Sequence, residues 1–219
     1  MNVRLCDKYR PRTLDDVVGQ PCLRYLRGLV DQPHSTCLLF ESPEGGVGKT
    51  STALALAAEL GRQDEMSGLT IQPCSDLSVE RARELFDTTL RYRPFEGRGW
   101  RVLMLEELDW ASVQCQRFLK VALETRLPSR CVVVATSNDA GKLDRPLLQR
   151  FQLYRFQSGE AFRDACQQRL AQIWAVESDG EDLPPHWMLW GDIGGDGFSM
   201  RVALGQMQDW LALRGVVRV

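Results

Sequence analysis

Short apolar runs alternate with longer stretches of helical character over roughly the first 156 residues. Runs such as RVLML (101–105) and CVVVAT (131–136) are continuously apolar, which is typical of strands buried on both faces of a sheet. Strands are expected at residues 37–40, 69–74, 101–105 and 131–136. Helices are expected between them, at residues 50–62, 78–92 and 112–124. This alternation predicts an α/β fold built on a mostly parallel sheet with helices on both faces.

The strand-like runs end near residue 156. Two helical stretches follow, at residues 157–177 and 199–213, separated by a loop rich in Asp, Gly and Pro. We therefore expect two domains: an α/β domain at residues 1–156 and a small helical lid domain at residues 157–219.

The composition of the 219 residues limits the class of protein. Hydrophobic residues make up 44% and charged residues 26%, as in ordinary globular proteins, and no apolar run approaches the roughly 20 residues that span a bilayer. The N-terminus is charged within a few residues, so we expect neither a signal peptide nor a membrane partner. Seven cysteines without a C-x-x-C pair favour reduced thiols in a cytoplasm over disulfides or zinc. The expected location is a bacterial or phage-infected cytoplasm, or the nucleoid. The net charge of −2 argues against coating nucleic acid by charge alone, but it leaves room for a local basic track.

A glycine-rich segment, SPEGGVGKT (42–50), lies between an expected strand and an expected helix. It matches the phosphate-binding P-loop G-x-x-x-x-G-K-[ST], except that Pro43 replaces the first glycine. Backbone N–H groups of such a loop face the phosphates, Lys49 would reach the β and γ oxygens, and the Thr50 hydroxyl would ligate Mg²⁺. The alternative is a glycine-rich turn with a chance G-K-T, which the strand–helix context disfavours. We expect a nucleotide to be held by Gly45, Gly46, Val47, Gly48, Lys49, Thr50 and Ser51.

Two acids follow one expected strand, in RVLMLEELD (101–109). An apolar strand followed by an acidic pair resembles a Walker B element, in which the first acid orients the Mg²⁺ water shell and the second polarises the attacking water. Glu106 stands where the first acid is usually aspartate, and its extra methylene would shift or loosen the metal. Glu107 takes the catalytic position. Solvated acids also end strands in proteins without this chemistry, and the upstream P-loop favours the functional interpretation.

Four further segments occur in the order found in one protein family: KYRPRTLDDVVGQ (8–20), VVVATSN (132–138), DRPLLQR (144–150) and FSMRVALGQMQ (198–208). Together with the P-loop and the acidic pair, they resemble the clamp-loader ATPases of the AAA+ superfamily, particularly replication factor C small subunits. Clamp-loader ATPases of T-even phages also carry proline at the position of Pro43. The resemblance covers essentially the whole chain and implies an AAA+ P-loop domain, a helical lid, and ATP with Mg²⁺ as cofactors. Because the sequence stops at Val219, we expect the family's helical collar domain to be absent.

The resemblance also implies roles for single residues around ATP. Asn138 would be the sensor 1 residue that contacts the γ-phosphate or the attacking water. Arg201 would be the sensor 2 residue, which reaches from the lid to the γ-phosphate. Arg150 would be an arginine finger acting on a neighbour's ATP, although Gln149 and Phe151 replace the family's flanking Ser and Cys. The residues near the adenine would be Asp7, Lys8, Tyr9 and Val18.

Two arginines lie near the start of the second expected helix, for which Ser78 is a candidate N-cap. Arg81 and Arg83 oppose the helix dipole there, and a DNA phosphate would compensate them. In the resembling family this helix follows the template backbone, so Ser78, Arg81 and Arg83 are expected to bind DNA without reading its sequence. The alternative is local pairing of Arg81 with Glu84 and of Arg83 with Glu80.

The resemblance implies an ATP-hydrolysing subunit of a sliding-clamp loader. Its partners would be primer–template DNA, a ring-shaped clamp, and other loader subunits in a ring or spiral, including a separate subunit that carries the collar. Two alternatives stay open. One is a nucleotide-binding structural subunit of such a loader, with little turnover because Glu106 weakens metal binding. The other is a different AAA+ DNA motor, such as a branch-migration or repair ATPase.

Overall fold

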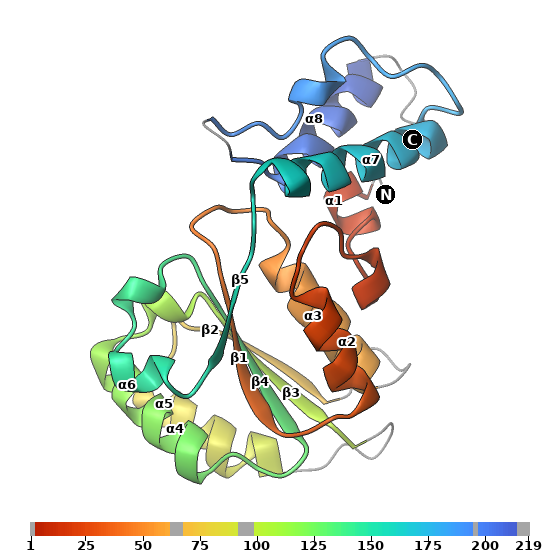
Figure 1. Ribbon diagram of the computed structural model, residues 1–219. Coiled ribbons are helices and arrows are strands. Elements are labelled where there is room, and N and C mark those ends of the chain that lie inside the picture. Colours follow the sequence, from red (N-terminus) through yellow and green to blue (C-terminus); the bar gives the residue numbers. More distant parts are fainter. Residues whose placement is uncertain (1–2, 62–67, 92–98, 195–196, 214–219) are drawn as a thin grey trace.

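The computed structural model describes residues 3–61, 68–91, 99–194 and 197–213. Within them lies one parallel sheet of five strands in the order β2-β3-β4-β1-β5 (Figure 1). The strands are β1 (Thr36–Glu41), β2 (Leu69–Pro73), β3 (Arg101–Glu106), β4 (Cys131–Ser137) and β5 (Gln152–Arg155). The α/β prediction and the four expected strands are confirmed, and β5 adds a strand beside β1.

Helices cover both faces of the sheet, because alternate residues of each strand face opposite sides. Leu38 and Phe40 of β1 belong to one buried cluster with Leu56, whereas Cys37 and Leu39 belong to a second cluster. One face carries α2 (Leu23–Asp31) and α3 (Lys49–Gly61), and the other carries α4 (Val79–Asp87), α5 (Val113–Thr125) and α6 (Arg145–Leu148) (Figure 1). Burial on both faces explains the continuously apolar strand sequences.

The helix α4 is shorter than its sequence predicted. Ser78 caps it as expected, since its Oγ accepts the backbone N–H of Arg81 at 3.1 Å. The helix ends at Asp87, and Thr88 leaves helical geometry with φ −123° and ψ −69°. Thr88 and the residue after it are β-branched, which weakens a helix, and a 3₁₀ turn follows at Thr89–Arg91.

The remaining helices agree with their predicted positions to within about three residues. The helices expected at 157–177 and 199–213 are α7 (Glu160–Glu177) and α8 (Met200–Leu213). The last residues of two expected helices, 62 and 92, lie outside the described residues. Further 3₁₀ turns lie at Leu14–Asp16, Leu108–Trp110, Ala140–Lys142 and Trp187–Leu189. None of the helices in the described ranges is long and apolar enough to span a membrane.

Beyond one end of the sheet, aromatic side chains of α7 pack against the segment that leads into α8 (Figure 1). The ring centroids of Trp174 and Trp190 are 5.8 Å apart, and those of Phe162 and Phe198 are 6.0 Å apart. Aromatic pairs at this spacing add about 0.5–1.5 kcal/mol to the burial of their surface. The lid helices thus have an apolar contact of their own, while the division of the chain at residue 156 stays a prediction.

The N-terminal helix α1 (Leu5–Lys8) packs against α8 of the lid (Figure 1). The backbone N–H of Leu5 donates to Oε1 of Gln208 at 2.9 Å. Lys8 pairs with Glu177 of α7 at 2.6 Å, and the Tyr9 hydroxyl donates to the same carboxylate. Burial alone would raise the pKa of Glu177, but the hydrogen bonds from Lys8 and Tyr9 outweigh it and lower that pKa. The N-terminal segment therefore contacts α7 and α8 before it reaches the sheet.

Gly19 allows a test of the contact between the N-terminal segment and the lid. Its φ is +67°, and an added Cβ would lie 2.8 Å from Cδ2 of Phe162. We expect Gly19→Ala to lower the free energy of unfolding by about 1–3 kcal/mol, because alanine is strained at positive φ and lacks room there. Urea unfolding measures the change.

Gly28→Ala is the control, because Gly28 lies inside α2 with nothing within 4 Å of an added Cβ. Alanine there should raise the free energy of unfolding by about 0.5–1 kcal/mol. A Gly19→Ala protein as stable as the wild type would contradict the strained contact.

Candidate nucleotide-binding and hydrolysis site

The loops after β1 and β4 lie side by side at the carboxyl edge of the sheet. The two strands are paired as far as Glu41 and Ser137, so the P-loop and the segment after β4 leave the sheet together. The chain crosses from β1 to β2 on one side and from β4 to β5 on the other. Diverging crossovers of this kind open a crevice in which α/β proteins bind ligands.

The P-loop between β1 and α3 depends on two glycines in left-handed geometry. The φ angle is +80° at Gly46 and +98° at Gly48, a region that residues with side chains rarely adopt. A Cβ on Gly46 would overlap Oγ of Ser199, so this glycine also lets the lid approach the loop. Pro43 is exposed and does not line the cavity described below. The unusual proline therefore lies outside the part of the loop that faces a ligand.

Lys49, the first residue of α3, is held by three acceptors. Its Nζ donates to the carbonyl oxygens of Ser42 at 2.8 Å and Glu44 at 3.0 Å, and to Oδ1 of Asn138 at 2.9 Å. Burial lowers the pKa of Lys49, whereas nearby carboxylates, Asp109 most strongly, favour the charged form. The predicted P-loop lysine and the predicted sensor asparagine therefore meet directly.

The two acids at the end of β3 lie in different places: Glu107 lines the cavity described below, and Glu106 does not. Glu107 lines the cavity with a left-handed backbone, φ 53° and ψ 56°, and its N–H donates to Oγ1 of Thr136 at 3.1 Å. Such backbone strain, about 1–3 kcal/mol, is concentrated at functional sites. Glu106 ends β3 and does not line the cavity. Asp109, which the sequence analysis did not select, accepts the backbone N–H of Asn138 at 3.2 Å and so joins the two loops.

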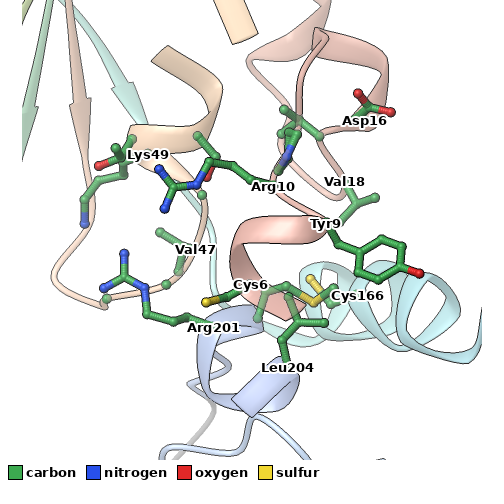
Figure 2. Close-up of a pocket in the computed structure, with 18 of the residues that line it drawn as sticks. Cys6, Tyr9, Arg10, Asp16, Val18, Val47, Lys49, Cys166, Arg201 and Leu204 are labelled. Atoms are coloured by element: carbon green, nitrogen blue, oxygen red, sulfur yellow. The ribbon is translucent and has the colours of Figure 1, made fainter. Parts of the chain in front are cut away.

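A cavity of about 450 Å³ lies between the P-loop, the N-terminal segment and the lid (Figure 2). Its volume falls in the range of about 300–1,000 Å³ that is usual for small-molecule sites. Basic side chains outnumber acidic ones in its lining, and Figure 2 shows Lys49, Arg10 and Arg201 extending into it from these three parts of the chain. The predicted residues that line it are Asp7, Tyr9, Val18, Gly45, Gly46, Val47, Gly48, Lys49, Thr50, Ser51, Glu107, Asn138 and Arg201.

The lining also includes residues that the sequence analysis missed. Cys6 and Arg10 come from the N-terminal segment, and Phe162, Cys166 and Arg169 come from α7. The three α7 residues are spaced i, i+4 and i+7, so they share one face of the helix. This spacing was the one feature of the sequence that could have grouped the three residues. It does not indicate which face of the helix lies toward a ligand.

Three residues expected at the nucleotide lie away from this cavity. Lys8 pairs with Glu177 on the lid, and Glu106 ends β3. Arg150 follows α6 and pairs with Glu124 of α5 at 2.7 Å, while its buried Nε has no hydrogen-bond partner in the described part of the chain. The position of Arg150 outside its own chain's cavity is compatible with the expected action on a neighbour's nucleotide, which stays a prediction.

The residues expected to contact DNA lie at the start of α4. Arg81 pairs with Glu84 at 2.6 Å, which is the local pairing considered as the alternative. The Arg83 guanidinium lies over the ring of Phe118, 5.9 Å from its centroid. Exposed ion pairs contribute at most about 1 kcal/mol, so the pair with Glu84 does not exclude a phosphate contact. The DNA contact of Ser78, Arg81 and Arg83 stays a prediction.

Residues 38–158, more than half of the chain, match the family described as "ATPase family associated with various cellular activities (AAA)". The chain belongs to the AAA family. Membership of this family accounts for the P-loop, which serves nucleotide binding, typically of ATP with Mg²⁺.

This AAA protein is related to replication factor C small subunits. It is 30% identical over 173 residues to the replication factor C small subunit of Archaeoglobus fulgidus, and 32% identical over 180 residues to replication factor C subunit 3 of Saccharomyces cerevisiae. The alignments cover 78% and 80% of this chain, but 53% and 51% of those relatives. The chain thus spans about half the length of the curated relatives it matches.

Solved structures confirm the predicted AAA+ fold. The RuvB Holliday junction branch migration motor of Thermotoga maritima is similar with a TM-score of 0.70 at 18% identity, over 96% of this AAA chain and 69% of that one. A DNA polymerase III gamma-subunit-related protein of the same organism has a TM-score of 0.56 at 15% identity, over 71% and 52% of the two chains. At these identities the likeness concerns the fold alone.

Removal of the Lys49 ammonium tests the cavity as a nucleotide site. We expect Lys49→Ala to weaken binding of a fluorescent ATP analogue by about tenfold to hundredfold, because a hydrogen-bonded charge contributes about 1.5–3 kcal/mol. Fluorescence titration gives the dissociation constant. Lys142→Ala, at an exposed lysine outside the cavity, should bind as the wild type does. Unchanged affinity in Lys49→Ala would exclude the P-loop as the phosphate site.

Proposed function

We propose that this chain is an ATP-hydrolysing subunit of a sliding-clamp loader. The observation that carries the proposal is a single cavity shared by Lys49, Asn138 and Arg201, with Arg150 on a different surface of the same chain. The first three suit a triphosphate bound in the chain, and the fourth suits one bound by a neighbour. Similarity to replication factor C small subunits supports a loader over other members of the family.

The P-loop would hold the triphosphate. Its backbone N–H groups and the start of α3 favour an anion, and Lys49 adds a partly buried cation. A phosphate oxygen would replace one of the carbonyl acceptors of Lys49, which keeps its contact with Asn138. Asn138 would then lie beside the terminal phosphate.

The residues present fit a Mg²⁺ ion that is shared with a triphosphate. The described residues contain no group of three or more His, Cys, Asp or Glu side chains placed to hold a metal on their own. Mg²⁺ in nucleotide sites keeps water and phosphate ligands and needs only one or two from the protein, and Thr50 lines the cavity for that role. The ion, when bound, would neutralise charge that develops on the phosphate oxygens.

Glu107 would orient the attacking water. Its side chain belongs to the cavity, and the hydrogen bond from its backbone to Thr136 ties it to the strand that carries Asn138. A carboxylate in this position accepts a proton from the water as it attacks the terminal phosphate. Glu107 and Asn138 would thus act on the same water from adjacent strands.

The two arginines would make hydrolysis depend on the lid and on assembly. Arg201 lies at the start of α8, so an approach of the lid brings its charge to the terminal phosphate. Arg150 would enter the cavity of the next subunit, where fixed charge stabilises the transition state. Ser78, Arg81 and Arg83 would meet primer–template phosphates, and the assembled subunits would bind the ring-shaped clamp.

A second candidate function is a nucleotide-binding structural subunit of such a loader. It is favoured by Glu106, which replaces the usual aspartate and does not line the cavity. Such a subunit would bind ATP and donate Arg150 to a neighbour, but it would turn over slowly itself.

Phosphate release distinguishes the two functions. With primer–template DNA, clamp and partner subunits present, we expect wild-type protein to hydrolyse ATP and Glu107→Gln to lose about 10²–10⁴-fold in turnover while still binding ATP, because the proton acceptor is removed. Glu160→Gln, at an exposed acid in the first turn of α7, should hydrolyse ATP at the wild-type rate. Wild-type protein that stays inactive under these conditions would favour the structural subunit.

A mixing experiment tests the action of Arg150 in trans. Arg150→Ala alone should lose about 10³-fold or more in assembled turnover, as other ATPases do without this arginine. Mixing it with Glu107→Gln should restore part of the activity, because some interfaces then combine an intact Arg150 with an intact Glu107. Native mass spectrometry with ATP and DNA shows whether copies of the chain are neighbours.

Arg145→Ala, at the start of α6 and five residues before Arg150, is the control and should leave turnover unchanged. Full activity of assembled Arg150→Ala would rule out the finger.

A further inference from the structure

Gln20 lies just before α2, and its side-chain amide joins three parts of the chain. Its Nε2 donates to the carbonyl oxygens of Val47 at 3.1 Å and Gln157 at 3.0 Å, and its Oε1 accepts the N–H of Gln157 at 2.9 Å. The residue is only 4% exposed, so water does not compete for these groups. One amide thus uses both of its donors and an acceptor to hold the P-loop against the first residue of the predicted lid.

The two segments that connect the sheet with the predicted lid meet at Gln20, which lies in the N-terminal segment and bonds to Gln157. The first leaves β5 through Phe156, whose N–H donates to the carbonyl of Glu41 at 2.8 Å, and continues to Gln157. The second is the N-terminal segment, which starts on α8 and reaches Gln20 through Gly19, in close contact with Phe162 of α7. A shift of the lid relative to the sheet therefore moves a partner of Gln20.

The P-loop partner of Gln20 lies in the part of the loop that faces the cavity. Val47 is 1% exposed and stands between Gly46 and Gly48, the two left-handed glycines. A phosphate that draws on the N–H groups of this loop moves the peptide units around Val47. Its carbonyl carries that movement to Gln20.

We propose that Gln20 is a positioning residue that transmits the state of the P-loop to the hinge of the lid at Gln157. The inference rests on the proposed nucleotide site and adds a residue to it. Gln20 does not line the cavity, so it acts on the ligand only through Val47 and Gln157. Loss of its donors should leave ATP binding largely intact and uncouple the lid from it.

A second buried glutamine provides a matched control. Gln116 of α5 is 5% exposed, and its Nε2 donates to the carbonyl oxygens of Ala111 at 3.0 Å and Lys142 at 3.4 Å. Its Oε1 accepts the N–H of Asp144 at 2.8 Å. The bonding pattern is that of Gln20, but Gln116 joins segments of the α/β domain, and none of its partners lines the cavity. Equal substitutions at the two positions separate the general effect of breaking a buried amide network from coupling to the lid.

Hydrogen exchange at the backbone amide of Gln157 tests the proposal, because this N–H donates to Gln20 itself. In wild-type protein we expect ATP to slow exchange of the peptide that contains Gln157 by about tenfold. Gln20→Glu keeps the acceptor and loses both donors. It should reduce this slowing to about twofold or less, while ATP protection of the P-loop peptide persists and the dissociation constant stays within about threefold of wild type. Gln116→Glu should respond as the wild type does.

Gln20→Met keeps the side-chain volume and removes all three hydrogen bonds, so it repeats the test if Gln20→Glu does not fold. A full ATP response at Gln157 in a folded Gln20 variant that binds ATP overturns the proposal. An equal loss of response in Gln116→Glu overturns it as well. Failure of wild-type protein to bind ATP overturns the proposed nucleotide site, and the coupling with it.

Discussion

The partly buried ammonium of Lys49, with its three acceptors, is the interaction on which the rest of the site depends. A cation removed from water needs acceptors on every side, and here they come from two different segments, the P-loop carbonyls and Asn138. The pairing of β1 with β4 puts those segments next to each other. The contacts of Lys49 therefore also fix the path of the loop and the position of Asn138, so the proposed nucleotide binding and sensing share one polar cluster.

Local sequence patterns predicted the sheet and its helices well, because their causes are local. The strands of RVLML and CVVVAT are buried on both faces, so they appear as unbroken apolar runs. The P-loop was predicted because its glycines and Lys49 must be close in sequence to act together. The edge strand β5 was missed because its residues are largely exposed and it is only four residues long. The predicted end of α4 was wrong because the two threonines after Asp87 stop the helix although the amphipathic pattern continues.

Contacts between distant segments could not be predicted in this way. Nothing near Lys8 or Tyr9 indicates that both bind Glu177, which lies far along the chain in α7. This contact attaches the N-terminal segment to α7, and both line the cavity together with the P-loop. Asp109 was missed for a related reason: its carboxylate accepts the backbone N–H of Asn138, which follows a different strand.

The attachment of α1 to α8 has a mechanical consequence, because it gives the predicted lid a second tie to the sheet: a non-covalent one through the N-terminal segment before α2, beside the covalent one after β5. A body tethered by one strand can twist and slide as well as swing. With two tethers that run past the same point, the twist and the slide are restrained, and mainly a swing toward or away from the sheet is left.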